Sequence, residues 1–432
     1  MPKAKGKKGK KGKKGKEEEP EVLARDFGAE FEPVDGLDGM LGIEHLEFTR
    51  KVEAVAEHLT EFQAAAAASS GGKVDISGLR CHELPATLVE DPVTIESCVS
   101  VDASDNLLVG SALAPLAALR SIVSLDLTAN FIVGPGPAVL GELRKLESLR
   151  LGDNKMTALP DEWAGMMLLR EFVAPRNSLT EVNPACLAAW PRLTVLDLRE
   201  NKIKTLPDEV TSCLALKQLL VAKNELEALP SSLGSLGSLE TLDASGNKLG
   251  AVPSSVSECA RLRVLRLSRN AVTDLGPETF SLMGRLEQLW LNNNKLAALP
   301  SSVGACRGLE ILNLSNNSLK DLPMELGSCT AMREFYCNHN AGLTAIPESL
   351  KAWTAVEAVS LKGCKLKGLP EPEAEFAEAW SASLRHLDVT SKGKKPSCKL
   401  PKEAFSDKMY RTTVVGAAEK KVKKPKKAKK KG

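Results

Sequence analysis

An asparagine recurs every 23 or 24 residues through most of this 432-residue chain. A fixed period of that size is the signature of stacked structural repeats, and it constrains the fold more strongly than composition does. Because each repeat of such a stack contacts only its neighbours, we expect a solenoid. The asparagines are Asn106, Asn130, Asn154, Asn177, Asn201, Asn224, Asn247, Asn270, Asn294, Asn317 and Asn340.

Each asparagine closes a phrase of regularly spaced leucines. One copy runs Leu193-Thr-Val-Leu196-Asp-Leu198-Arg-Glu-Asn201-Lys-Ile203-Lys-Thr-Leu206-Pro207. Alternate residues of a strand point to opposite faces, so the leucines should face inward and the residues between them outward. Parallel strands about 4.8 Å apart need a crossover, which the leucine–proline segment and one or two helical turns supply. Because this crossover is bulkier than the strand, we expect the stack to curve with its strands on the inner side.

The asparagine should turn the chain out of the strand and bond backbone groups of adjacent loops. We predict a ladder of such side chains inside the coil, with the asparagines from Asn130 to Asn340 as its rungs. Cys364 takes the next position in the series and can keep part of the role through its weak S–H donor. Leu79 takes the same position in a degenerate first repeat and cannot donate.

Composition divides the chain into four parts. Residues 1–20 are a lysine- and glycine-rich tail that lacks the apolar surface needed for order. Residues 21–73 include a predicted amphipathic helix over 43–68, which would cap the exposed apolar end of the solenoid. Residues 74–401 form the solenoid, with one degenerate repeat, about twelve clear repeats and a degenerate C-terminal cap that begins with a short helix in 371–383. Residues 402–432 are a C-terminal extension and a second lysine-rich tail, which we expect to be disordered.

The phrase Leu229-Pro230-Ser-Ser-Leu233-Gly-Ser-Leu236-Gly-Ser-Leu239 resembles the cytosolic Ras-group class of leucine-rich repeats. Plant intracellular Ras-group-related proteins and Scribble-like scaffolds belong to that class, and the resemblance covers roughly residues 74–401. It implies an α/β fold, a right-handed leucine-rich repeat solenoid or horseshoe with a parallel sheet on the concave face and short helical or irregular crossovers on the convex face. It also implies a binding platform in signalling, polarity or cytoskeletal assembly. The lysine- and glycine-rich opening is similar to N-termini common among axonemal proteins.

Four cysteines share one position, eleven residues before the asparagine, where other repeats have leucine, methionine or tryptophan. They are Cys213, Cys259, Cys306 and Cys329. Free cysteine behaves as a small hydrophobe, so we expect buried, reduced thiols. No apolar run has the length of a membrane span or a signal peptide, so we expect a cytoplasmic protein. The basic tails are also compatible with a location at a cilium, at the cytoskeleton or in the nucleus.

A candidate binding surface follows from the residues that the strands display outward. Arg266, Trp290, Asn313 and Tyr336 share one position on four successive strands and should be neighbours. Arg269, Asn292, Asn293, Asn338 and His339 flank this row. Tryptophan, tyrosine and arginine are enriched at interface hot spots, so we predict that a protein partner binds here on the concave face. The alternative is that Trp290 and Tyr336 are ordinary strand aromatics that cover their neighbours.

A second outward row alternates in charge, and we predict a solvated ladder of cross-strand ion pairs rather than a site. Its members are Asp102, Asp126, Arg150, Glu171, Arg176, Asp197, Arg199 and Glu200.

The charge of the chain is concentrated in its two ends. Residues 1–16 and 416–432 together hold 18 of the 58 basic residues and one of the 55 acidic residues, so the rest carries 40 basic and 54 acidic side chains. We expect the tails to bind a polyanion, which would be an acidic protein tail such as that of tubulin, RNA, DNA or an anionic lipid surface. No aromatic residue is interleaved with these lysines, which argues against sequence-specific reading of nucleic acid. A solvating or nuclear-import role is the alternative.

No motif in the sequence supports catalysis. The phosphate-binding Gly-x4-Gly-Lys-Ser/Thr phrase, the Gly-x-Ser-x-Gly elbow and the His-Glu-x-x-His zinc motif do not occur, and the five histidines are scattered. We therefore expect neither an enzyme nor a bound cofactor or metal, and we expect a monomer. The predicted function is a protein-interaction scaffold in intracellular signalling or cytoskeletal or axonemal assembly, with the basic tails as electrostatic tethers. The alternative is a nucleic-acid- or ribosome-associated protein that binds through its lysine tails.

Overall fold

The computed structural model describes residues 72–85, 88, 92–368, 370, 375, 378–380, 383–389 and 413–415. The chain divides into the units Met1–Arg50 and Lys51–Gly432, and every described residue belongs to the second unit. The two lysine-rich tails, the expected capping helix over 43–68 and most of the C-terminal extension lie outside the described residues.

The described repeats form one parallel sheet of 15 strands, in which each strand pairs with those of the preceding and following repeats. The strands are β1 (Gly72–Asp75), β2 (Cys98–Asp102), β3 (Ser124–Asp126), β5 (Ser148–Arg150), β7 (Glu171–Val173), β8 (Val195–Asp197), β9 (Gln218–Leu220), β10 (Thr241–Asp243), β11 (Val264–Arg266), β12 (Gln288–Trp290), β13 (Ile311–Asn313), β14 (Glu334–Tyr336), β15 (Ala358–Ser360), β16 (His386–Asp388) and β17 (Thr413–Val415). In most of them the central residue is buried and the two flanking residues face outward, as the leucine spacing predicts.

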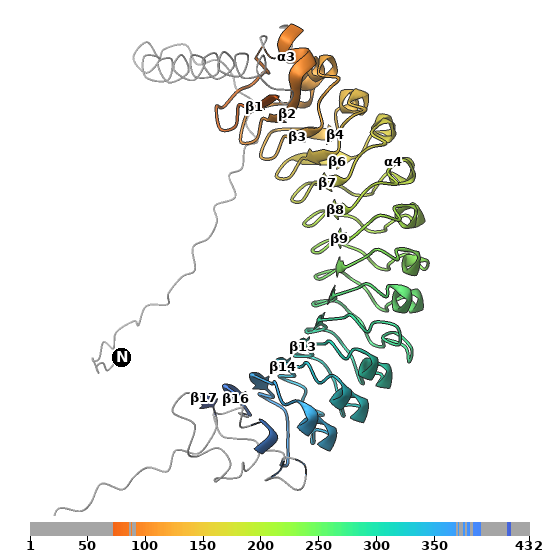
Figure 1. Ribbon diagram of the computed structural model, residues 1–432, viewed down its shortest axis with the longest axis vertical. Coiled ribbons are helices and arrows are strands. Elements are labelled where there is room, and N and C mark those ends of the chain that lie inside the picture. Colours follow the sequence, from red (N-terminus) through yellow and green to blue (C-terminus); the bar gives the residue numbers. More distant parts are fainter. Residues whose placement is uncertain are drawn as a thin grey trace, which may run out of the picture. The chain divides into compact units, whose positions relative to one another are not determined.

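Short helices make the crossovers on the opposite side of the repeats, so the sheet lines the inner side of their curve (Figure 1). Most are short 3-10 helices: η1 (Gly110–Ala118), η2 (Ala138–Glu142), η3 (Asp161–Gly165), η4 (Asp208–Ser212), η5 (Leu233–Ser235), η6 (Ser254–Glu258), η7 (Ser301–Ala305), η8 (Met324–Ser328) and η9 (Glu348–Ala352). Two are α-helical, α3 (Pro92–Ser97) and α4 (Pro184–Ala189). The α-helix α4 begins where Asn183 caps the backbone N–H of Ala185 and Pro184 supplies a residue with no N–H to satisfy.

Two features of the sheet were not expected from the sequence. The strands β4 (Val133–Pro135) and β6 (Lys155–Ala158) form a separate two-stranded parallel sheet just after Asn130 and Asn154. The strand β17 pairs in parallel with β16, so the main sheet continues past residue 401, where we expected the solenoid to end. In the segment 371–383, the described residues 375 and 378–380 are helical, in agreement with the short helix expected there.

The core is one continuous apolar column running through the described repeats. Leucine fills most of it, and four tryptophans are fully buried: Trp163, Trp190, Trp353 and Trp380. Phe172 lies between Trp163 and Trp190, with ring centroids 5.9 and 5.3 Å away. The four cysteines that share a repeat position are buried and free, as predicted. Burial raises the pKa of Cys213 and Cys306 to about 12, so both remain protonated thiols at neutral pH.

Candidate functional site

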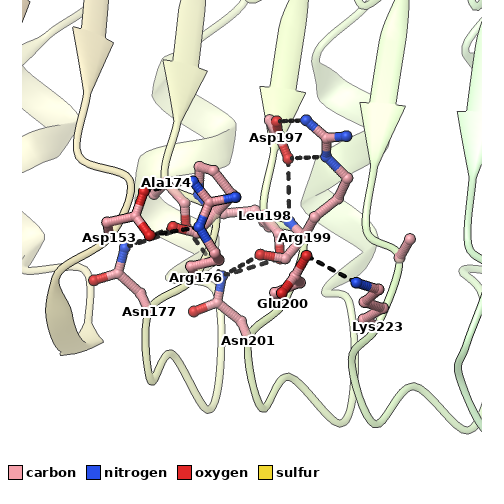
Figure 2. A network of polar contacts seen from close by, with 12 residues as sticks. Asp153, Ala174, Arg176, Asn177, Asp197, Leu198, Arg199, Glu200, Asn201 and Lys223 are labelled. Atoms are coloured by element: carbon pink, nitrogen blue, oxygen red, sulfur yellow. Dashed lines mark hydrogen bonds and ion pairs between the residues drawn. The ribbon is translucent and has the colours of Figure 1, made fainter. Parts of the chain in front are cut away.

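The asparagine side chains are polar rungs that connect successive repeats (Figure 2), and all of them are buried except Asn270, which is half-buried. The Asn201 amide nitrogen donates to the backbone oxygens of Leu198 in its own repeat and Ala174 in the preceding one, both at 3.0 Å. Its side-chain oxygen accepts the backbone N–H of Leu179, also at 3.0 Å. This pattern recurs from Asn106 to Asn340, so backbone groups that the turn leaves unpaired are satisfied inside the coil.

Between the ends of this ladder, one backbone carbonyl of each repeat accepts the asparagine amides of two successive repeats. The Leu198 oxygen accepts from Asn201 at 3.0 Å and from Asn224 of the following repeat at 2.9 Å. At the end of the asparagine series, Cys364 donates its S–H to the backbone oxygen of Cys337 at 3.1 Å, which continues the ladder with a weaker donor.

A second ladder lies on the crossover side, and the sequence analysis missed it. In the position eleven residues before the asparagine, cysteine S–H and tryptophan N–H groups donate to a backbone carbonyl in the short helix of the preceding repeat. The pairs are Cys213 with Leu187 at 3.4 Å, Cys329 with Val303 at 3.4 Å, Trp190 with Trp163 at 3.1 Å and Trp353 with Leu326 at 3.2 Å. The apolar spacing of this position indicated burial, but nothing in it distinguished a donor from a leucine.

The predicted row of larger side chains is formed by strands in direct register. Arg266 on β11 lies opposite Trp290 on β12, which lies opposite Asn313 on β13, which lies opposite Tyr336 on β14. All four side chains are half-buried on the outward side of the sheet. We call these four residues the concave row.

The side chains of Asn313 and Asn338 on this surface form hydrogen bonds that stabilise the fold. The Asn313 side-chain oxygen accepts the backbone N–H of Ser315 at 3.1 Å, which closes the turn at the end of the strand. Aspartates at the same position in other repeats do likewise, as Asp243 does with Ser245 at 3.0 Å. The Asn338 side-chain oxygen accepts from both the Ser360 hydroxyl and the Lys362 backbone N–H.

Arg266, Arg269 and Trp290 of this surface bond neither a carboxylate of a described residue nor the turn that follows their strand. Arg266 donates to the neutral Gln288 side chain at 3.2 Å, and neither Arg266 nor the exposed Arg269 forms an ion pair with a described residue. Among the described residues, Trp290 Nε1 is the one buried side-chain nitrogen or oxygen that lacks a hydrogen-bond partner. The indole N–H groups of Trp163, Trp190, Trp353 and Trp380 all have one.

Tyr336 and the residues beside the rungs complete this surface. The Tyr336 hydroxyl donates to Glu334 at 3.0 Å, and partial burial together with this bond raises the tyrosine pKa. The Asn292 side-chain oxygen accepts from the Ser268 hydroxyl at 2.5 Å. His339 is exposed and lies in the left-handed region with a φ of 59°, as does Arg269 with 55°. The residue before each rung takes this conformation in most repeats, which turns its side chain out of the coil.

The charge-alternating row forms ion pairs in the middle repeats, although not all of them join neighbouring strands. Figure 2 shows two pairs between repeats, Arg176 with Asp153 and Lys223 with Glu200. Their nitrogen–oxygen distances are 2.5 and 3.0 Å. Arg199 instead pairs with Asp197 of its own repeat at 2.6 Å. Outside the view, Arg150 lies 3.5 Å from Glu171. At the start of this row, Asp102 and Asp126 accept turn N–H groups.

A further charged row lies where the strands begin, seven residues before the rungs, and the sequence analysis did not identify it. We call it the strand-entry row. Its ion pairs are Arg170 with Glu147 at 2.9 Å, Lys217 with Glu240 at 3.7 Å, Arg263 with Glu287 at 2.8 Å and Arg333 with Glu357 at 2.6 Å. Solvent screens these surface pairs, so each contributes little to stability.

The described surface also contains a groove of about 540 Å³ near the first rungs. Its lining includes Phe131, over whose ring the Lys155 ammonium lies at 5.7 Å, and the paired Asp153 and Arg176. Within the described residues, no three histidine, cysteine or acidic side chains gather in a metal-binding arrangement. None of the helices in the described part of the chain has the length and apolar character to span a bilayer.

Comparison with known proteins supports the same architecture. The leucine rich repeat family model matches residues 169–226, 191–249 and 260–319. No curated protein matches the chain in sequence. Among solved structures, a leucine-rich repeat protein of Leptospira interrogans is 22% identical with a TM-score of 0.69, over 82% of this chain and 98% of that one.

Two further structures share the fold. The plant peptide hormone receptor RGFR1, solved in complex with RGF2, is 23% identical with a TM-score of 0.58, over 73% of this chain and 56% of the receptor chain. The functional domain of InlJ from Listeria monocytogenes is 18% identical with a TM-score of 0.52, over 78% of this chain and 65% of that one. Domains of this kind generally mediate protein–protein interaction and are typically non-catalytic. The repeats of this chain thus have the fold of a leucine-rich repeat solenoid.

Proposed function

We propose that the chain is a protein-interaction scaffold whose partner binds the concave row and the residues that flank it, Arg269, Asn292, Asn338 and His339. The observation that carries this proposal is the unpaired N–H of Trp290. A buried donor without an acceptor costs about 1–3 kcal/mol, and the four other tryptophans of the chain avoid this cost. A partner that supplies an acceptor recovers that free energy on binding.

The surroundings of Trp290 support a binding role. Arg266 and Tyr336 lie one and two strands away in the same row, so the residue types favoured at hot spots are contiguous. Because Trp290 Nε1 is covered in the free protein, an acceptor reaches it only after a side chain beside it changes rotamer. Such rotamer changes at a surface are fast compared with binding.

The test is affinity capture with the full chain and a double variant, Trp290→Ala with Tyr336→Ala. The matched control is Met167→Ala with Leu214→Ala, which removes two exposed apolar side chains from the crossover side of the repeats. We expect the first variant to lose the main partner and the control to retain it, with equal urea unfolding midpoints. Undiminished capture by the concave variant refutes the proposal.

We further propose the finer assignments made from the sequence. The protein belongs to the Ras-group class, acts in cytoplasmic signalling or cytoskeletal assembly, and uses its lysine tails as tethers to a polyanionic surface. A glycine-rich tail of 16 residues spans roughly 22 Å on random-coil scaling, which is enough to hold the body near such a surface without fixing its pose.

The lysine tails favour one alternative function, association with nucleic acid or ribosomes. Eighteen lysines make up most of the charge at the two ends, and binding through them should weaken steeply with salt. This alternative predicts RNA that co-purifies with the full chain and is lost both at raised salt and on deletion of residues 1–16 and 416–432. A partner complex that survives nuclease treatment excludes it.

A further inference from the structure

The concave surface of the four repeats from rung Asn270 to rung Asn340 differs in charge from that of the five preceding repeats. The positions four, two and one residues before these rungs contain two arginines and a histidine but no aspartate or glutamate. We call these positions in the four repeats the strand-exit patch; it contains Arg266, Arg269, Trp290, Tyr336 and seven asparagines and serines, with His339 at its end. In the five preceding repeats the same positions contain four acidic and four basic side chains.

The basic side chains of those preceding repeats are already neutralised. Arg150, Arg176, Arg199 and Lys223 each form an ion pair with a carboxylate of this chain. Arg266 and Arg269 form none with any described residue. The nearest acid in register is Asp243, opposite Arg266, and its side-chain oxygen accepts the Ser245 N–H of its own turn. The two arginines therefore keep donors available for a carboxylate from outside.

At the other edge of the same repeats, most acidic side chains already have an ion pair or a hydrogen bond within this chain. Glu334, the first residue of β14, accepts the Tyr336 hydroxyl. In the strand-entry row, Glu287 pairs with Arg263 and Glu357 with Arg333. Glu310 is the remaining carboxylate of that row in these repeats. Because the paired glutamates and arginines of the strand-entry row largely cancel each other, an anionic segment is attracted instead to the strand-exit patch, whose arginines form no ion pair with a described residue.

The dimensions of the patch fit a short extended peptide. The step from Arg266 to Tyr336 crosses three strand spacings, or about 14 Å, and an extended chain covers this with four or five residues. We propose that the partner presents an acidic, extended peptide segment across the strand-exit patch. Its carboxylates pair with Arg266 and Arg269, and one of its carbonyl or carboxylate oxygens accepts the Trp290 N–H. This inference rests on the proposed function and names the chemistry of its partner.

Intrinsic fluorescence provides a local measurement. Trp290 is half-buried, whereas the four other tryptophans of the chain are fully buried, so the emission lost in Trp290→Phe reports on this surface alone. The probe is a ten-residue peptide of alternating glutamate and alanine, and its twin has glutamine in place of glutamate. Peptide held by the lysine tails leaves the Trp290 emission unchanged.

We expect the glutamate peptide to change the Trp290 emission and the glutamine twin to bind at least about tenfold more weakly. Arg266→Gln with Arg269→Gln should weaken the glutamate peptide by about tenfold or more. Arg261→Gln with Arg285→Gln, which removes the same charge beside the strand-entry row, should change the affinity by less than about twofold. An equal response to both peptides, an equal loss in both double variants, or an unchanged Trp290 emission each overturns the proposal.

Affinity capture of the natural partner separates this inference from the function on which it rests. If the partner is lost with Trp290→Ala and Tyr336→Ala but retained with Arg266→Gln and Arg269→Gln at every salt concentration, the concave site stands and the acidic peptide is refuted. If both variants retain the partner, the concave site itself is refuted.

Discussion

Replacing one rung tests how the solenoid is held together. Asn317 is buried, and its amide nitrogen donates to the backbone oxygens of Leu291 at 3.0 Å and Leu314 at 2.9 Å. Its side-chain oxygen accepts the Leu296 N–H at 3.0 Å. The preceding residue, Asn316, is an exposed asparagine with a φ of 57° and takes no part in the ladder. The chain therefore offers an adjacent control of the same residue type.

The cost of Asn317→Ala follows from which groups lose their last partner. Leu291 O still accepts from Asn294 and Leu314 O from Asn340, so neither carbonyl is left unsatisfied. The Leu296 N–H has no other acceptor and becomes an unpaired buried donor, which costs about 1–3 kcal/mol. The lost amide donations add about 1 kcal/mol, giving a total of about 2–4 kcal/mol.

Urea unfolding of the full chain, followed by far-ultraviolet circular dichroism, measures this cost. Asn316→Gly retains a residue suited to positive φ and should unfold within about 0.5 kcal/mol of the wild type. Asn317→Ala should unfold at clearly lower urea with a similar m value. If the two variants have the same midpoint, the rung does not stabilise the coil and the account of the ladder is wrong.

Two other predictions concern stability, and one concerns the site. Because the thiol pKa values of Cys213 and Cys306 rise from 9.0 in the unfolded chain to about 12 in the folded one, the stability they contribute is complete below pH 9 and is lost as pH rises toward 12. The unfolding free energy of the wild type should therefore fall between pH 9.5 and 11.5 by up to about 3 kcal/mol per pH unit more steeply than that of a variant with alanine at both positions; equal slopes contradict the burial. Trp353→Phe removes a buried N–H that bonds Leu326 O and should destabilise by about 2–4 kcal/mol, as urea unfolding would show. The same change at Trp290 removes a donor that bonds nothing, so it should cost less than about 1 kcal/mol while weakening the partner.

The fold was predictable because its determinants repeat along the chain. The spacing of Leu196, Leu198 and Asn201 fixes a strand, its inward face and a turn, and eleven further copies reinforce the assignment. The same spacing placed Arg266, Trp290, Asn313 and Tyr336 in one row, which the strand register bears out. The period carries no such information past the clear repeats, and β17 was missed there.

The hydrogen-bond partners of individual side chains were not predictable, because they depend on atomic positions that the repeat spacing does not specify. Asn313 and Trp290 occupy the same repeat position, yet the side chain of one closes its own turn while the N–H of the other bonds nothing. The ladder on the crossover side depends on whether Cys213 Sγ lies near the Leu187 carbonyl, which the apolar pattern does not specify. The strand-entry row was not predicted because it lies one residue before most strands, outside their alternating pattern, although charges of both signs recur there at a fixed spacing in the sequence.

The polar side chains of the solenoid fall into groups according to the partners that they bond within the chain. The rungs bond the backbone, the aspartates at the strand ends bond the turns, and the basic residues of the middle repeats bond carboxylates of this chain. A polar side chain whose bonds are complete gains little from a partner, because it must give up one bond to make another. Arg266, Arg269 and Trp290 retain unused donors in two neighbouring repeats, and no acid lies among them. We therefore expect the binding free energy of the proposed partner to be concentrated in this part of the concave surface rather than spread along all 15 strands.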